Sequence, residues 1–381
     1  MNTDRRDFIK KASVIASSAG LLSTVNCTKN TNINRGNGKM KLTYKKYQLT
    51  LKHVFTIAKN SRTTTPDMLI QIHYNGITGY GEAAMPPYYP ENPETAARFY
   101  NKLDLGQFKD PFQIEKILDY VDQVEEGNHF AKASVDIALH DLVGKMMNQP
   151  WYKIWGYDKT KAPSTSFTIG IDKPDVVQEK TREASSYNVL KIKLGGDNDK
   201  EMIENVRKIA PNKKLYVDVN GGWKDKHFAL DMAHWLKGQK VVFIEQPMPK
   251  AQLDDIAWLT QNSPIPIVAD ESIHRIPEVL AAHEIYNGIN IKLMKCTGLR
   301  EAHKMINLAR SLDMKILMGC MTATSCSVSA ASHLSPAIDW ADLDGNLLIS
   351  NDPFDGVKVI DGKLEISDRP GIGVILIQEI K

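Results

Sequence analysis

The chain has 381 residues, of which 42% are hydrophobic and 24% are charged, and its formal net charge is +3. This length and composition indicate a globular chain with one large domain or two smaller ones. The near-neutral charge, without a basic stripe interleaved with aromatic residues, argues against nucleic acid as a partner.

Residues 1–38 are predicted to be an export signal followed by a tether. The pair Arg5-Arg6 precedes an apolar, small-residue run at 12–25 that resembles a twin-arginine signal. The run is too short and too Ser-rich for a stable membrane span. Cys27, just after it, resembles a lipoprotein acceptor. The sequence thus predicts export to the periplasm, either with a lipid anchor at Cys27 or after simple cleavage.

Residues 39–160 read as an α+β module. The runs "LTYKKYQLTL", "DMLIQIHYNG" and "ITGYGEA" have the pattern of strands, and Asn75-Gly76 between two of them is a strong hairpin signal. The stretch "FAKASVDIALHDLVGKMM" has apolar residues at helical spacing.

Residues 161–350 contain eight short apolar runs, most of them separated by helical patterns. This alternation predicts parallel strands in a (β/α)7β TIM-like barrel. A doubly wound sheet is the alternative, although no GxGxxG follows the first strand. The tail at 351–381 returns to hairpin-like patterns, and we expect it to complete a capping domain with residues 39–160.

A charged residue ends each of five consecutive strand-like runs, and successive members lie 22 to 27 residues apart: Lys193, Asp218, Glu245, Asp270 and Lys292. In a barrel the carboxyl ends of the strands converge on one face, where active sites lie. The five side chains are therefore predicted to surround one space.

The three carboxylates among them, Asp218, Glu245 and Asp270, would form an oxygen cage suited to Mg²⁺ or Mn²⁺. Zinc fits less well, because no His or Cys stands at these strand ends. A single acidic residue here would more simply be a helix N-cap, but three in register favour a metal site.

The stretch "VLKIKLGG" places Lys191 and Lys193 on one face of a strand, because strand side chains alternate. A neighbouring cation should lower a lysine pKa and so provide a base. Lys292 would lie on the other side of the carboxylates.

Several motifs together resemble the enolase superfamily, in its muconate-lactonizing-enzyme subgroup, and within it the dipeptide epimerases. They are "GYGEAAMPPYYPE", "SVDIALHDLVGK", "KIK", "DVN", "EQP", "ADES" and "NIKLMK". The resemblance implies that Lys193 and Lys292 are the acid/base catalysts and that Lys191 contacts the substrate carboxylate. It also implies Mg²⁺ at the three carboxylates.

The resemblance further assigns substrate contacts. Asp342 and Asp344 in "DLDG" would bind the α-ammonium of a dipeptide, since two carboxylates pair with a cation, although a turn-capping Asp pair is the alternative. Arg62 in "KNSRTTTPD" would bind a glutamyl side-chain carboxylate. Thr168 and Cys320 would line the substrate site.

The implied activity is the interconversion of L-Ala-D-Glu and L-Ala-L-Glu by two-lysine proton transfer through a metal-stabilised enolate, in muropeptide metabolism. A homo-oligomer is expected. The alternatives are an epimerase of other dipeptides, an N-acyl amino acid racemase and an exported dipeptide-binding lipoprotein. Ala323 in "MTATS" stands where the family often has Glu, which leaves the side-chain specificity open.

Overall fold

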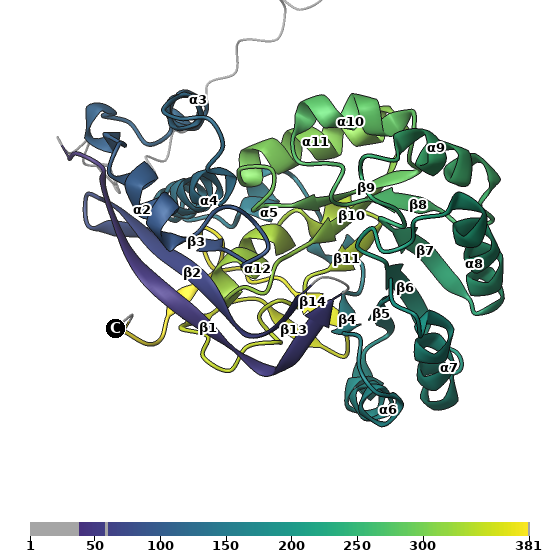
Figure 1. Ribbon diagram of the computed structural model, residues 1–381. Coiled ribbons are helices and arrows are strands. Elements are labelled where there is room, and N and C mark those ends of the chain that lie inside the picture. Colours follow the sequence, from purple (N-terminus) through teal and green to yellow (C-terminus); the bar gives the residue numbers. More distant parts are fainter. Residues whose placement is uncertain (1–37, 58–59, 380–381) are drawn as a thin grey trace, which may run out of the picture. The chain divides into compact units, whose positions relative to one another are not determined.

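The computed structural model describes residues 38–57 and 60–379. Its first part is an antiparallel sheet with the strand order β1-β2-β3 (Figure 1). These strands are β1 (Lys41–Ile57), β2 (Asn60–Tyr74) and β3 (Ile77–Ala84).

The tight turn between β2 and β3 is the predicted Asn-Gly hairpin. Tyr74 pairs with Ile77 across Asn75 and Gly76, whose φ angles are 49° and 78°. Positive φ at both central residues is the requirement of a type I′ turn, which Asn and Gly meet with the least strain. The hairpin prediction is confirmed.

Helix α4 (His129–Met146) packs directly on β3, and glycines allow this close contact. A Cβ atom on Gly79 would lie 2.1 Å from Ala138 O, and one on Gly81 would lie 2.0 Å from Ser134 O. The other helices of this part are α2 (Pro93–Tyr100), η1 (Leu105–Gln107), α3 (Ile114–Gln123), α5 (Trp151–Ile154) and η2 (Lys159–Lys161).

Eight parallel strands follow, and each pairs with the next along the chain. They are β4 (Ser166–Ile169), β5 (Val189–Lys193), β6 (Lys214–Asp218), β7 (Val241–Glu245), β8 (Ile267–Ala269), β9 (Gly288–Lys292), β10 (Lys315–Gly319) and β11 (Trp340–Asp342). A parallel bridge between Thr165 and Ala341 joins the last strand to the first. The predicted barrel is confirmed, and the doubly wound sheet is excluded.

Helices connect the successive strands on the outside of the barrel (Figure 1). They are α6 (Pro174–Glu183), η3 (Ala184–Ser186), α7 (Asp199–Ile209), α8 (Lys226–Gly238), α9 (Leu253–Asn262), α10 (Ile276–His283), α11 (Leu299–Ser311), α12 (Ser325–Ser332) and η4 (Ser335–Ala337). The seven α-helices between eight strands give the (β/α)7β order.

Apolar side chains fill one end of the barrel interior. A buried cluster there comprises Val189, Tyr216, Phe243, Val268 and Leu317. Since side chains two apart share a face of a strand, the next inward positions along β5, β6 and β7 are charged. The interior therefore changes from an apolar floor to a charged site within about two residues of each strand.

The tail after the barrel returns to the cap. Gly371 N donates to Gln149 O (3.0 Å), and Ile372 N donates to Asp141 Oδ1 (3.0 Å). Its strands are β12 (Phe354–Asp355), β13 (Lys358–Ile360), β14 (Lys363–Glu365) and β15 (Ile375–Leu376). The segment limits 39–160, 161–350 and 351–381 stay predictions.

Candidate active site

A cavity of about 770 Å³ lies at the carboxyl ends of the barrel strands, under residues of the cap. The barrel contributes Lys193, Asp270 and Lys292 to its wall, and the cap contributes Arg62 and Tyr88. Three of the five charged residues that the sequence placed at strand ends thus line one cavity, whereas Asp218 and Glu245 are not among its lining residues.

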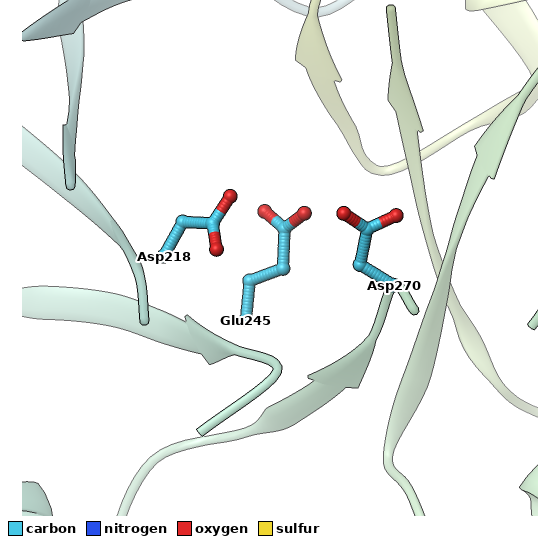
Figure 2. A group of neighbouring side chains, drawn as sticks. All are labelled: Asp218, Glu245 and Asp270. Atoms are coloured by element: carbon cyan, nitrogen blue, oxygen red, sulfur yellow. The ribbon is translucent and has the colours of Figure 1, made fainter. Parts of the chain in front are cut away.

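Three carboxylates converge at this end of the barrel: Asp218 and Glu245 end β6 and β7, and Asp270 directly follows β8. One oxygen of each lies within 4.8 Å of the others, and all three side chains are buried (Figure 2). Among the described residues, this carboxylate cluster is the one group of acidic, His or Cys side chains that could hold a metal ion.

The ionisation of the carboxylate cluster is uneven. Burial opposes ionisation of Asp218, but Lys191 and Lys193 outweigh it and lower the pKa of Asp218 to about 2. Burial and the neighbouring Asp218 raise the pKa of Glu245 to about 8. Glu245 Oε2 is buried and accepts no well-aligned hydrogen bond. Burial and the charge of Asp218 thus disfavour the ionised form of Glu245, although Lys191 Nζ lies 2.6 Å from its Oε2.

Lys191 lies in the middle of this negative charge. Its Nζ is 2.6 Å from Glu245 Oε2, 2.7 Å from Asp342 Oδ2 and 3.0 Å from Asp218 Oδ2. Burial disfavours its ammonium form, but the carboxylates outweigh burial and raise the pKa of Lys191 well above its usual range. The expectation that two like charges on β5 would produce a lowered lysine pKa is wrong for Lys191, because acidic residues of other strands dominate its surroundings.

Lys193 and Lys292 lie on opposite sides of the carboxylate cluster. Their strands, β5 and β9, are four places apart in the barrel of eight. Lys193 Nζ lies 2.6 Å from Asp218 Oδ2, and Lys292 Nζ lies 2.7 Å from Asp270 Oδ2. Both side chains also line the cavity. The two amines thus reach the same space from two directions.

Asp342 and Asp344 form a second acidic group beside β4. Ser166 Oγ donates to Asp342 Oδ1 (2.6 Å), and Thr168 N donates to Asp344 Oδ2 (2.7 Å). Burial and the charge of Asp342 raise the pKa of Asp344 to about 7. Cys320 lies next to this pair, with its Sγ 3.3 Å from Asp342 O. The four residues Thr168, Cys320, Asp342 and Asp344 all line the cavity.

Arg62 reaches the cavity from β2 of the cap. Its Nε donates to Thr65 Oγ1 and its Nη2 donates to Thr322 Oγ1, both at 3.1 Å. The guanidinium carbon lies 5.1 Å from the Phe55 ring centre and 5.4 Å from that of Tyr88. Its Nη1 is buried and has no hydrogen-bond partner among the described residues.

Two residues of the site were missed from the sequence. Lys295 is fully buried, and its Nζ donates to Asp270 O (2.6 Å) and pairs with the Asp270 carboxylate. The available signal was the second lysine of the otherwise largely apolar run "NIKLMK". No pattern in the sequence indicated Thr322, the hydrogen-bond partner of Arg62. Ala323, the next residue, which left the side-chain specificity open, is fully buried.

The chain matches two family descriptions. Residues 40–156 match "Mandelate racemase / muconate lactonizing enzyme, N-terminal domain", and residues 175–380 match "Enolase C-terminal domain-like". An L-Ala-D/L-Glu epimerase of Bacteroides thetaiotaomicron is 57% identical over 98% of this chain and 100% of the relative. An L-Ala-D/L-amino acid epimerase of Pedosphaera parvula is 37% identical over 87% and 97%.

Solved structures agree with these matches. The dipeptide epimerase from Enterococcus faecalis, complexed with Mg and L-Leu-L-Tyr, is 30% identical with a TM-score of 0.82 and covers 88% of this chain and 99% of its own. The substrate-liganded L-Ala-D/L-Glu epimerase from Bacillus subtilis is 26% identical with a TM-score of 0.83, covering 88% and 98%.

Export to the periplasm is the prediction that these comparisons contradict. The relatives are named for an epimerase activity alone. Residues 1–37 of the expected signal and tether at 1–38, with Cys27, lie outside the described residues. An arginine pair before a short apolar run is a pattern of low specificity, which explains the error. No described helix has the length and apolarity needed to cross a membrane.

The relatives also remove the alternative of a non-catalytic binding lipoprotein, because they are named for an epimerase activity. The fold, the carboxylate cluster and the matches over nearly the whole chain point the same way. The chain belongs to the mandelate racemase/muconate lactonizing enzyme family of the enolase superfamily, among its dipeptide epimerases, which are isomerases.

Proposed function

We propose that the chain is a Mg²⁺-dependent epimerase of L-Ala-D-Glu and L-Ala-L-Glu that inverts the α-carbon of the C-terminal residue. The observation that carries the choice of glutamate is the Arg62 guanidinium: Arg62 lines the cavity, and its buried Nη1 has no hydrogen-bond partner among the described residues. A buried charged donor of this kind is stabilised by an anionic partner such as a carboxylate. L-Ala-D-Glu occurs in peptidoglycan, so the proposed role is in muropeptide metabolism.

Asp218, Glu245 and Asp270 are the residues that would hold the metal. Three buried carboxylates that each place one oxygen within 4.8 Å of the others fit a small hard cation such as Mg²⁺ or Mn²⁺. When bound, such a cation supplies positive charge that stabilises a carboxylate whose α-proton is being removed.

Lys193 and Lys292 carry out the proton transfers in this proposal. One amine takes the α-proton, and the electron pair of the broken C–H bond moves into the planar enolate. The opposite lysine, as an ammonium group, donates a proton to the other face and so inverts the centre. Their positions on opposite strands support this assignment.

Asp342 and Asp344 would bind the α-ammonium of the N-terminal residue, beside Thr168 and Cys320. Lys191, paired with Asp342 and Glu245, links this acidic group to the carboxylate cluster and would contact the substrate carboxylate. An N-acyl amino acid has no ammonium group and would leave the buried Asp344 without a cationic partner, whereas Asp342 already pairs with Lys191. This argues against an N-acyl amino acid racemase.

The pH dependence of substrate binding tests this assignment. With its pKa raised to about 7, Asp344 is neutral below that pH and attracts an ammonium group less. We expect KM for the dipeptide to rise about tenfold as the pH falls from about 8 to about 6. Initial rates should show this dependence in the wild type and a flatter one in Asp344→Asn. An equally steep KM profile in the variant would contradict the role of Asp344.

The role of Arg62 is tested by Arg62→Met, which keeps an unbranched side chain but removes the charge. We expect kcat/KM for L-Ala-L-Glu to fall about 100-fold, mainly through KM, because a charge-assisted hydrogen bond is lost. The value for L-Ala-L-Met should change far less. Arg369→Met, which removes a surface ion pair with Asp355, is the matched control. An equal loss on both dipeptides would exclude Arg62 as the specificity residue.

An epimerase of broader dipeptide range is the second candidate, since the relative from Pedosphaera parvula is named for L-Ala-D/L-amino acid dipeptides. Incubation of a dipeptide library in D₂O, followed by mass spectrometry, separates the two. Rapid deuterium incorporation into L-Ala-Glu above all others supports the proposal, and preference for apolar C-terminal residues contradicts it. The homo-oligomeric state expected from the sequence stays a prediction.

A further inference from the structure

A buried glutamate of the cap binds the barrel next to the active site. Glu82 lies on β3 and is fully buried. Its Oε1 accepts from Thr324 N (2.6 Å), and its Oε2 accepts from Thr324 Oγ1 (2.6 Å) and Ser327 N (2.8 Å). Thr324 is the N-cap of α12. A carboxylate of one domain thus satisfies donors at the helix N-terminus of the other, a favourable position for negative charge.

The loop that Glu82 holds forms part of the cavity wall. We call residues 320–324, between β10 and α12, the β10–α12 loop. Cys320, Met321 and Thr322 of this loop line the cavity. Thr322 Oγ1 accepts the hydrogen bond from Arg62 Nη2. A short path therefore leads from Glu82 through Thr324 and Thr322 to the guanidinium.

A second carboxyl group supports Glu82. Asp67 is fully buried on β2, its Oδ1 accepts from Met68 N (2.6 Å), and its Oδ2 has no donor among the described residues. Burial raises the pKa of Asp67 to about 7, and burial together with Asp67 raises that of Glu82 well above its usual range. The neighbouring Asp67 carboxyl disfavours ionisation of Glu82, which adds to the effect of burial on the pKa of Glu82.

We propose that Glu82 is a positioning residue that fixes the β10–α12 loop from the cap and thereby orients Arg62 for substrates with an acidic side chain. The inference rests on the proposed function of Arg62 as the binder of that side chain. It explains why a buried carboxylate is placed across a domain contact where an apolar side chain would pack at lower desolvation cost.

Helix capping alone is the competing explanation, and Asp352 provides the matched control. Asp352 Oδ2 accepts from Ser325 N (2.9 Å) and Ser325 Oγ (2.6 Å) at the same end of α12. It does not bind Thr324, however, and it follows the barrel instead of belonging to the cap sheet. If capping of α12 were all that mattered, Asp352→Asn and Glu82→Gln should have similar effects on catalysis.

The experiment compares L-Ala-L-Glu with L-Ala-L-Gln, which differ in charge but hardly in shape. For Glu82→Gln, the ratio of the two kcat/KM values should fall about tenfold, mainly through KM for the acidic dipeptide, because a misoriented guanidinium loses its carboxylate contact. Thr322→Val, which removes the acceptor for Arg62 Nη2, should shift the ratio in the same direction. Asp352→Asn should leave the ratio within about twofold of the wild type.

An unchanged ratio in both Glu82→Gln and Thr322→Val would overturn the inference, as would an equal shift in Asp352→Asn. If Glu82→Gln does not fold, as judged by circular dichroism, the Thr322→Val ratio decides alone. Failure of the wild type to epimerise L-Ala-L-Glu would instead overturn the proposed function, so the two failures are distinguishable.

Discussion

Chelation of divalent metal should abolish epimerisation, and Mg²⁺ or Mn²⁺ should restore it. Asp218→Asn, Glu245→Gln and Asp270→Asn keep the size of each side chain but remove one negative charge from the carboxylate cluster. Each should lower kcat by at least about 10²-fold, the range seen when one electrostatic contact to developing charge is removed. Turnover in D₂O measures the loss of catalysis, and titration calorimetry independently measures the loss of Mg²⁺ binding.

For Glu245→Gln, the loss of activity should not come from unfolding. Because burial and Asp218 raise the pKa of Glu245 to about 8, its carboxyl is largely protonated at neutral pH without the cation, and the amide should leave that fold about as stable as before. Asp255→Asn, which breaks a surface ion pair with Lys226 (2.9 Å), is the control for a lost carboxylate elsewhere. Full activity of metal-stripped enzyme, or unaltered Mg²⁺ affinity in all three cluster variants, would refute the assignment.

The second large effect is stereochemical. Lys193 and Lys292 lie on strands four places apart, so each should reach only one face of the planar enolate. Lys193→Ala should block proton abstraction from one epimer, and Lys292→Ala should block it from the other. Each variant should still exchange the α-proton of the epimer that faces its remaining lysine. Epimerisation needs both amines and should fall about 10²- to 10⁴-fold.

The measurement is α-proton exchange in D₂O for L-Ala-L-Glu and L-Ala-D-Glu, followed by NMR. Lys295→Met is the matched control, because Lys295 is a buried lysine of the same segment that binds Asp270. Its loss should slow exchange from both epimers alike, without stereochemical bias. Near wild-type epimerisation by Lys292→Ala would contradict the two-base mechanism.

Much of the barrel could be predicted because its signals are local. Fully buried parallel strands appear as short apolar runs, and helical patterns between them give the connections. A charge at the end of a run must lie at the carboxyl face once the strands are parallel. Asp218, Glu245 and Lys292 needed no more information than this. The Asn75-Gly76 turn is equally local, because positive φ at two residues is a property of those residues.

Export was predicted from a local pattern as well, and there the pattern was not specific enough. The side-chain specificity of the site was harder still. Arg62 could be assigned to the substrate side chain only by resemblance, and its partner Thr322 lies 260 residues away along the chain. Glu82 and Thr324 are separated by 242 residues. The periodicity of a sequence carries no information on which of its distant residues come into contact in the folded protein.

The sequence by itself determined the strand order, the charged strand ends and the apolar floor beneath them. Only the tertiary structure decided the raised pKa of Lys191, the buried and unpaired Nη1 of Arg62 and the hydrogen bonds between Glu82 and Thr324 of the β10–α12 loop. The reason is physical: alternation and spacing depend on neighbours along the chain. The charge state of a buried group depends on the sum of the fields and hydrogen bonds of residues that folding brings together from distant segments.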